Sequence, residues 1–101
     1  MSRTYEIRYL PAAQQDLLDI FEYIRRDDPD AAEALLAQFD RTIANLTDHP
    51  LIGIIPKDER LQRLGYRMLV VSRYLIFYVV KKDVVQIRRV IHGSRNYTLL
   101  L

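Results

Sequence analysis

The sequence GYRMLVVSRYLIFYVVKKDVVQIRRVIHGSRNY, residues 65–97, decides the fold of this chain. Within it, three blocks are rich in β-branched and aromatic residues: 66–71, 74–80 and 84–92. Short polar breaks separate the blocks, and this pattern predicts consecutive strands joined by tight hairpins. The middle block, YLIFYVV, shows no polar alternation. We therefore expect a central strand that is covered on both faces.

The N-terminal half predicts a strand followed by two helices. Residues 4–9 alternate between apolar and polar side chains, which is typical of a half-buried strand. Pro11 precedes apolar residues at three- and four-residue spacing, so we expect an amphipathic helix to about Asp27. The dipeptide Asp28-Pro29 predicts the cap and first turn of a second helix, which ends near residues 49–50. So short a connection predicts an antiparallel helical hairpin.

Residues 50–63 are predicted to be a loop held by apolar anchors: Leu51, Ile52, Ile54 and Ile55. The resulting order, β-α-α-β-β-β, predicts an α+β fold in one domain, residues 1–101. The helical hairpin is expected to pack on one face of a small antiparallel sheet. The first strand must join one edge of the three-strand meander, and the sequence favours neither edge.

The strands are apolar in both phases, so the sheet needs a cover on each face. For example, Tyr66 and Met68 lie in one phase, and Leu69 and Val71 in the other. The helical hairpin can cover only one side. We expect either the C-terminal tail or a separate binding partner to cover much of the second side.

Composition places the chain among ordinary globular proteins, with half of its residues hydrophobic and 28% charged. No apolar run reaches the roughly 18–20 residues that a membrane span needs. The N-terminal sequence MSRTYEIRYLP lacks the apolar core of a signal peptide, so we expect a cytoplasmic location. Cysteine is absent, which excludes disulfides and thiolate chemistry and fits a reducing compartment.

Charge is distributed unevenly between the two halves of the chain. Residues 1–56 hold 5 Lys/Arg and 10 Asp/Glu, a net charge of −5, whereas residues 57–101 hold 10 and 3, a net charge of +7. A basic half favours a polyanion or an acidic protein as its partner. The alternative is that the two halves attract each other within the fold.

Several kinds of site are not expected. The three isolated glycines form no phosphate-binding loop, and neither Ser72 nor Ser94 lies in a nucleophile elbow. The two histidines, His49 and His92, are far apart, so we expect no metal site and no cofactor. The carboxylate pair Asp16/Asp19 and the group at 27–30 are interpreted as solvent-facing and capping residues.

The polar cluster that ends the third block is the candidate site. His92, Arg95 and Tyr97 could place an imidazole, a guanidinium and a phenol on one rim. Metal-free RNA cleavage needs a base, an acid and a cation for the phosphate, which these groups can supply. Binding without chemistry is a second interpretation. In a third, purely structural one, His92 bonds locally and Tyr97 packs the tail onto the sheet.

Three segments, LPAAQQDLLDIFEYI, LGYRMLVVSRYLIFYVV and VVQIRRVIHGSRNY, resemble the ParE/RelE superfamily of toxins from bacterial type II toxin–antitoxin modules. The similarity covers essentially the whole chain. The superfamily comprises RelE-like ribosome-dependent mRNA endonucleases and ParE-like toxins that poison DNA gyrase. The nuclease branch typically carries an arginine within the middle strand, where this chain has Leu75; Arg73 lies two residues earlier. The resemblance therefore favours the ParE branch.

The resemblance implies a toxin that inhibits DNA gyrase without chemistry of its own. A ParD-like antitoxin with an acidic C-terminal segment would neutralise it in a hetero-oligomer. The residues expected to bind the target are Arg67, Arg73, Arg88, His92 and Arg95.

Two alternatives stay open. A RelE-like endonuclease would use His92 as base or acid, Arg73 and Arg95 on the phosphate, and Tyr97 as an acid or orienting group. A degenerate member would bind only its antitoxin and the operator complex.

Overall fold

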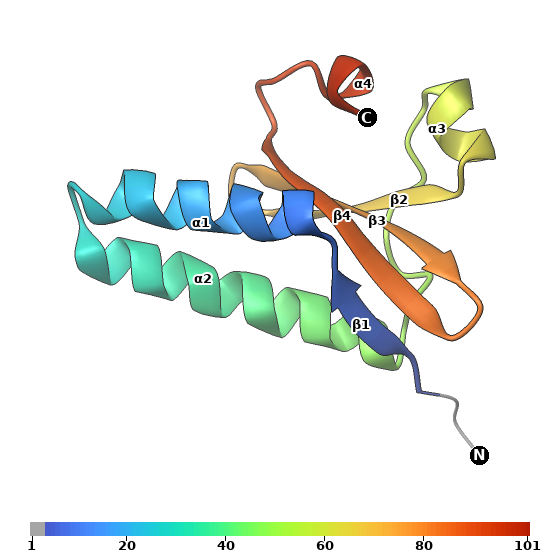
Figure 1. The fold of residues 1–101 in the computed structure, drawn as a ribbon, viewed down its shortest axis with the longest axis horizontal. Helices are drawn as coiled ribbons and strands as arrows, with labels where there is room; N and C mark the ends of the chain where they lie inside the picture. Colours follow the sequence, from blue (N-terminus) through green and yellow to red (C-terminus); the bar gives the residue numbers. More distant parts are fainter. Residues whose placement is uncertain (1–3) are drawn as a thin grey trace.

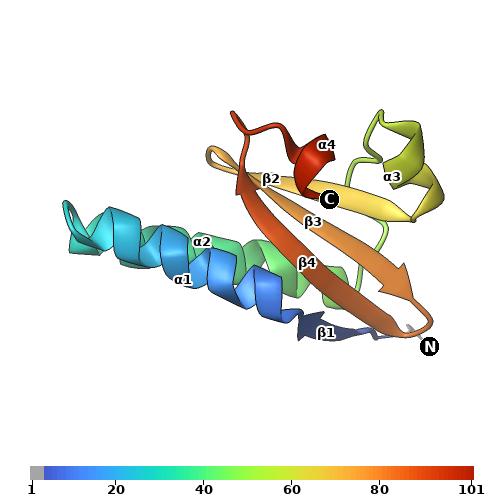
Figure 2. The same ribbon diagram turned by 45° about the horizontal axis from the view of Figure 1, so that its top comes forward.

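The computed structural model describes residues 4–101. Its elements, in chain order, are β1 (Glu6–Tyr9), α1 (Pro11–Arg25), α2 (Pro29–Ala44), the 3-10 helix η1 (Asn45–Thr47), α3 (Glu59–Arg63), β2 (Tyr66–Val71), β3 (Tyr74–Lys81), β4 (Val84–His92) and α4 (Tyr97–Leu100). Helices α1 and α2 form an antiparallel hairpin whose far end extends past the sheet (Figure 1). The hairpin lies on one side of the sheet and α3 and α4 on the other (Figure 2). The predicted α+β fold is confirmed.

The sheet has the order β1-β4-β3-β2. The predicted meander of β2, β3 and β4 is antiparallel throughout. β1 joins the free edge of β4 and runs parallel to it, with Ile7 opposite Val85. The sheet is therefore mixed where the sequence suggested an antiparallel one. Running in this direction, β1 leads directly into α1 beside the same edge (Figure 1).

The two long helices begin where their local signals predict. Pro11 occupies the first turn of α1, and Pro29 that of α2. The carboxylate of Asp28 caps α2 by accepting a hydrogen bond from the Ala31 N–H, at 3.1 Å. The first core forms between this hairpin and the sheet. Its buried members are Ala13, Phe39, Ile43, Leu46, Val71, Ile76, Tyr78, Val85, Ile87 and Val90.

A second core lies on the opposite face of the sheet. Its buried residues are Leu61, Tyr66, Phe77, Val79 and Ile91, against which the tail residues Tyr97, Leu100 and Leu101 pack. β3 contributes to both cores, as predicted for a central strand. The sequence left open whether the C-terminal tail or a binding partner covers this face of the sheet. In the structure the tail covers it, together with α3. The apolar second face is not by itself a sign of a missing partner.

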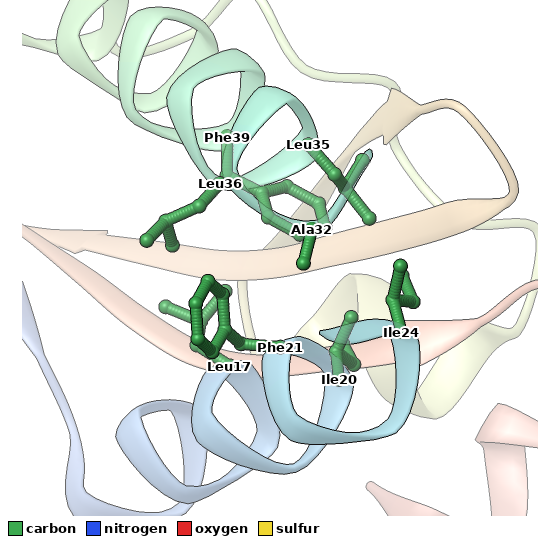
Figure 3. Close-up of a pocket in the computed structure, with 8 residues that line it drawn as sticks. All are labelled: Leu17, Ile20, Phe21, Ile24, Ala32, Leu35, Leu36 and Phe39. Atoms are coloured by element: carbon green, nitrogen blue, oxygen red, sulfur yellow. The ribbon is translucent and has the colours of Figure 1, made fainter. Parts of the chain in front are cut away.

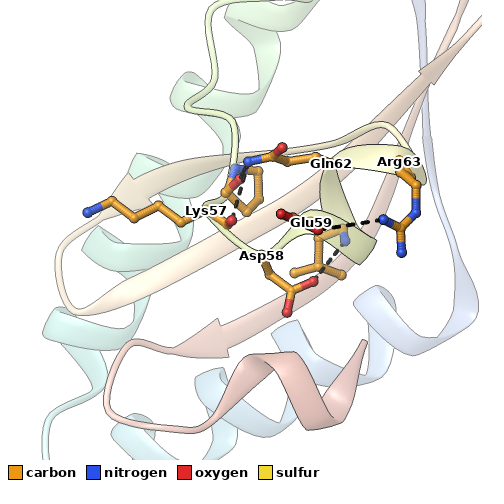
Figure 4. A network of polar contacts seen from close by, with 7 residues as sticks. Lys57, Asp58, Glu59, Gln62 and Arg63 are labelled. Carbon is orange, nitrogen blue, oxygen red and sulfur yellow. Dashed lines mark hydrogen bonds and ion pairs between the residues drawn. The ribbon is translucent and has the colours of Figure 1, made fainter.

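The prediction that residues 50–63 form only a loop is wrong, because they include α3. The Asp58 carboxylate caps this helix by accepting from the Leu61 N–H, and Gln62 donates to the Pro56 carbonyl oxygen (Figure 4). Arg60 then donates to the carbonyl oxygens of Thr98 and Leu101, which ties α3 to the tail. A helix of five residues is too short to show a periodic apolar pattern.

The prediction that apolar side chains anchor the segment before α3 is also wrong. The side chains in question, Leu51, Ile52, Ile54 and Ile55, are each more than half exposed to solvent. Backbone contacts hold the segment instead: Ile54 forms a β-bridge with Met68, and Arg67 donates to the carbonyl oxygens of Leu51 and Gly53.

The buried Tyr78 side chain fixes the same segment from within the first core. Its hydroxyl accepts from the Gly53 N–H at 2.9 Å and donates to the Pro50 carbonyl oxygen at 2.8 Å. A Cβ at residue 53 would lie 2.5 Å from that hydroxyl oxygen, so only glycine fits. Burial raises the pKa of the Tyr78 hydroxyl.

Asp16 does not face solvent, contrary to the sequence interpretation. Its two carboxylate oxygens accept hydrogen bonds from the Arg89 guanidinium at 2.7 and 3.0 Å, and one of them also accepts from the Val90 N–H at 2.9 Å. The hydrogen bonds that its guanidinium donates to the Asp16 carboxylate raise the pKa of Arg89. The Leu10 N–H bonds the Ile87 carbonyl oxygen where β1 ends. Just beyond the end of β1, Asp16 therefore accepts the hydrogen bonds that the edge of β4 donates.

We expect Asp16→Ala to lower the free energy of unfolding by about 2–4 kcal/mol, because it strands a partly buried guanidinium and the Val90 N–H. Chemical denaturation measures the change. Asp19→Ala, on the same helix, should cost less than about 0.5 kcal/mol because the Asp19 carboxylate is exposed and, within residues 4–101, bonds only Gln15. Adding Arg89→Ala to Asp16→Ala should recover part of the loss. Equal stabilities of the two single variants would contradict this account.

We expect Tyr78→Phe to cost about 1–2 kcal/mol and to speed amide exchange at Gly53, because that N–H loses its buried acceptor. The raised pKa adds a pH dependence. The unfolded chain ionises this tyrosine first, so stability should fall as the pH rises above about 10. The fall should be smaller in Tyr78→Phe. Amide exchange measured by NMR tests the first statement, and unchanged exchange at Gly53 would refute it. Denaturation across alkaline pH tests the second, and an equal fall in both proteins would refute that one.

Candidate functional site

A broad groove of about 1040 Å³ lies between the helical hairpin and the end of the sheet where β4 stops. The helices contribute Asp19, Ile20, Tyr23, Ile24, Ala31, Ala34, Leu35 and Gln38, and the sheet end contributes Ser72, Arg73, Tyr74, His92, Ser94 and Arg95. The helical wall is thus mainly apolar, whereas the sheet end is cationic and polar. We call Arg73, His92 and Arg95 the cationic corner.

Two turns are held together to form the cationic corner. The β2–β3 turn contains Ser72, at a φ of 54°, and Arg73. The Gly93 N–H, directly after β4, donates to the Arg73 carbonyl oxygen at 2.8 Å. The Arg95 N–H donates to the carbonyl oxygen of His92 at 3.0 Å, which turns the chain back. The backbone therefore brings residues about twenty positions apart to one place.

A β-bulge decides which face of the sheet His92 meets. Along β3, Tyr78 pairs with Ile87 but Phe77 pairs with Arg89, so Arg88 is the extra residue. Ile87 faces the helical hairpin, and without the bulge the alternation would send His92 to the other face. With the bulge, His92 lies on the hairpin side and lines the groove.

Contacts within the corner orient the His92 ring. The Tyr74 ring meets His92 edge-on, with centroids 5.3 Å apart, and meets Phe39 at 5.8 Å. His92 Nδ1 accepts a hydrogen bond from the Ser94 N–H at 3.1 Å and lies 2.7 Å from the Ser94 hydroxyl. An amide N–H can only donate, so the neutral imidazole carries its proton on Nε2.

The structure brings only part of the predicted site together. Arg73, His92 and Arg95 line one groove, but Tyr97 packs on Phe77 on the opposite face of the sheet, with centroids 5.0 Å apart. The expectation that the phenol shares the rim is wrong, because the tail turns away after β4 to cover the second core. The local bonding of His92 and the packing of Tyr97 match the structural interpretation of these residues.

Two of the expected target-binding arginines lie outside the groove. Arg67 is occupied by the carbonyl oxygens of Leu51 and Gly53. Arg88 donates to the Gln86 side chain and lies over the Tyr66 ring, 5.5 Å from its centroid.

The helical wall of the groove was not foreseen from the sequence. Tyr23 is 71% exposed, an unusual position for a large aromatic side chain. That exposure could have been suspected, because Tyr23 lies next to Ile24 but outside the stripe of Leu17 and Ile20. What could not be foreseen is that the sheet end approaches it.

One further cavity and the acidic and histidine side chains of residues 4–101 are the candidates for an alternative site. A small cavity between α1 and α2 measures about 10 Å³, at the lower limit for a single water, and its lining offers a water no polar side chain (Figure 3). Among residues 4–101, no group of three or more histidine or acidic side chains could hold a metal ion. Over the same range, no helix is long and apolar enough to cross a membrane.

Comparison with known proteins identifies the family to which this chain belongs. Residues 7–97 match the family model described as ParE toxin of type II toxin–antitoxin system, parDE. The chain is 31% identical over 101 residues to the protein Y4kP of Sinorhizobium fredii, with complete coverage of both chains. The chain therefore belongs to the ParE toxin family.

Two solved structures share the fold at lower identity. One is the chromosomal ParDE toxin–antitoxin system from P. aeruginosa, at a TM-score of 0.76 and 17% identity, covering 90% of this chain and 98% of that one. The other is the toxin–antitoxin complex RelBE2 from Mycobacterium tuberculosis, at a TM-score of 0.61 and 22% identity, covering 88% and 98%. At these identities, the similarity establishes the architecture alone.

We expect Tyr97→Ala to lower the free energy of unfolding by about 1–2 kcal/mol, because it removes a partly buried ring from Phe77. Tyr97→Phe should be neutral, because no hydrogen bond of the hydroxyl supports the fold in residues 4–101. Thermal or chemical denaturation of both variants tests this. A large loss for Tyr97→Phe would show that the hydroxyl has a role which the packing does not explain.

Proposed function

We propose that this chain is a ParE-like toxin that inhibits DNA gyrase by binding it. The family model that matches the chain is named for parDE. The TM-score of the chain with the ParDE structure also exceeds its TM-score with RelBE2. In this proposal the chain acts in the cytoplasm, where its target lies. Binding requires a rigid surface and no acid–base pair.

The separation of the acid–base groups carries the proposal. His92 Nδ1 is occupied by Ser94, and its candidate partner Tyr97 lies on the other face of the sheet. At the position of the nuclease-branch arginine, Leu75 packs into the second core. A general acid and a general base must reach the same substrate, and these groups do not converge.

A RelE-like endonuclease is the second candidate, favoured by one observation. Arg73, His92 and Arg95 share the groove, so two cations and an imidazole could meet a phosphate. Such an enzyme would have to work without the Tyr97 hydroxyl as its acid. The two candidates therefore differ in the process that stops first, DNA synthesis or protein synthesis.

We further propose that a ParD-like antitoxin neutralises the toxin in a hetero-oligomer. The net charge of +7 in residues 57–101 supports an acidic partner segment. Coupled folding of such a segment onto the toxin would cover a large surface.

Inducing the chain in bacteria and pulse-labelling DNA and protein separately tests the function. We expect DNA synthesis to stop and cells to filament while translation continues, and the purified chain to inhibit gyrase supercoiling. Tyr97→Phe should inhibit growth as the wild type does. An early stop in protein synthesis, lost in His92→Ala, would establish the nuclease instead. Normal growth with folded protein would indicate a degenerate member.

A further inference from the structure

The cationic corner holds two arginines that the fold leaves unused. Five other guanidiniums of the described chain are occupied: Arg8, Arg25 and Arg89 pair with carboxylates, and Arg60 and Arg67 bond carbonyl oxygens. Arg26 and Arg41 also carry no ion pair within residues 4–101, but neither lines the groove. Within residues 4–101, neither Arg73 nor Arg95 has an ion pair or a side-chain hydrogen bond, although both line the same groove. Their charge is therefore available to a ligand.

The third member of the corner adds a hydrogen-bond donor. Because His92 Nδ1 accepts from the Ser94 N–H, the proton of the neutral ring lies on Nε2. Two contacts hold the His92 Nε2–H donor on the same side of the groove as the arginines. The Tyr74 ring meets the His92 ring edge-on, and the Gly93 N–H donates to the Arg73 carbonyl oxygen. Guanidinium groups and an imidazole N–H together fit an anionic oxygen pair, with bonds stronger than neutral ones.

The remainder of the groove indicates which class of ligand carries the anionic group. Its helical wall is apolar, including Ile20, Ile24 and Leu35, and it also carries the Asp19 carboxylate. A nucleic-acid backbone would bring several phosphates toward Asp19 and would leave the apolar wall unused. A polypeptide with one acidic side chain among aliphatic ones would satisfy both the corner and the wall.

We propose that the cationic corner binds an aspartate or glutamate of the antitoxin, while neighbouring aliphatic side chains of that segment lie on Ile20, Ile24 and Leu35. This inference rests on the antitoxin part of the proposed function and assigns it a site. Arg73 and Arg95 contact the carboxylate. His92 is a donor here and not a base.

Selection of short random peptides displayed against the full-length chain tests the corner without the antitoxin in hand. Peptides enriched by the wild type should combine an acidic residue with aliphatic neighbours. Synthetic peptides from that pool should bind about tenfold more weakly when the acid is changed to its amide, the effect of one charged hydrogen bond. The variant Arg73→Gln/Arg95→Gln should lose the enrichment and the preference. It should fold normally, as circular dichroism can verify, because both side chains are exposed and unbonded.

The matched control is Lys81→Gln/Lys82→Gln, which removes the same charge from the exposed β3–β4 hairpin, outside the groove. It should retain the preference. Equal loss in both double variants would mean general attraction to a basic protein and would overturn the proposal, as would peptides that bind without an acid. Tighter binding of oligouridylate than of the peptides, lost in Arg73→Gln/Arg95→Gln, would assign the corner to nucleic acid.

The assay contains neither gyrase nor ribosomes, so its outcome is separate from that of the toxin proposal. Acid-selective peptides with no growth inhibition would refute the toxin activity and leave the carboxylate site. Gyrase inhibition with no acid selection would refute the site and leave the activity.

Discussion

The attachment of Asp16 to Arg89 and Val90 is the interaction on which the rest of this structure depends. It fixes one turn of α1 against the edge of β4 by three hydrogen bonds, at the level where β1 has ended. Asp19 and Ile20 of the groove wall follow within one helical turn, and His92 follows Val90 by two residues. The spacing between the two sides of the groove is thus set by a partly buried ion pair, whose cost of desolvation is offset because every carboxylate oxygen is bonded.

The bulge at Arg88 works together with that attachment. Residues before it and after it both face the helical hairpin, so β4 contributes Ile87 to the first core and still presents His92 to the groove. The same extra residue keeps Ile91 in the second core. One insertion in a strand therefore serves two cores and aims a polar side chain, which regular alternation could not do.

Local signals predicted much of the fold, and long-range contacts account for the errors. The caps at Asp28-Pro29 and the apolar blocks of the meander act over a few residues, so the sequence reveals them. The partner of Asp16 lies more than seventy positions away, and solvation was the reasonable interpretation of an acidic pair on a helix. Residue types grouped Arg73, His92 and Arg95 as candidates, and the fold brings these three residues to one groove. They could not reveal that Tyr97 crosses to the other face, because that depends on how the tail turns.

The pairing of β1 with β4 has a consequence for the timing of synthesis. The first ordered strand of the chain has no neighbour in the sheet until residues 84–87 exist, and such a distant closure is slow and comes late. The helical hairpin can form early, but both sides of the groove are assembled only when the last strand arrives. A growing chain therefore lacks the groove for most of its translation, and both of its walls are present only after the last strand has been synthesised.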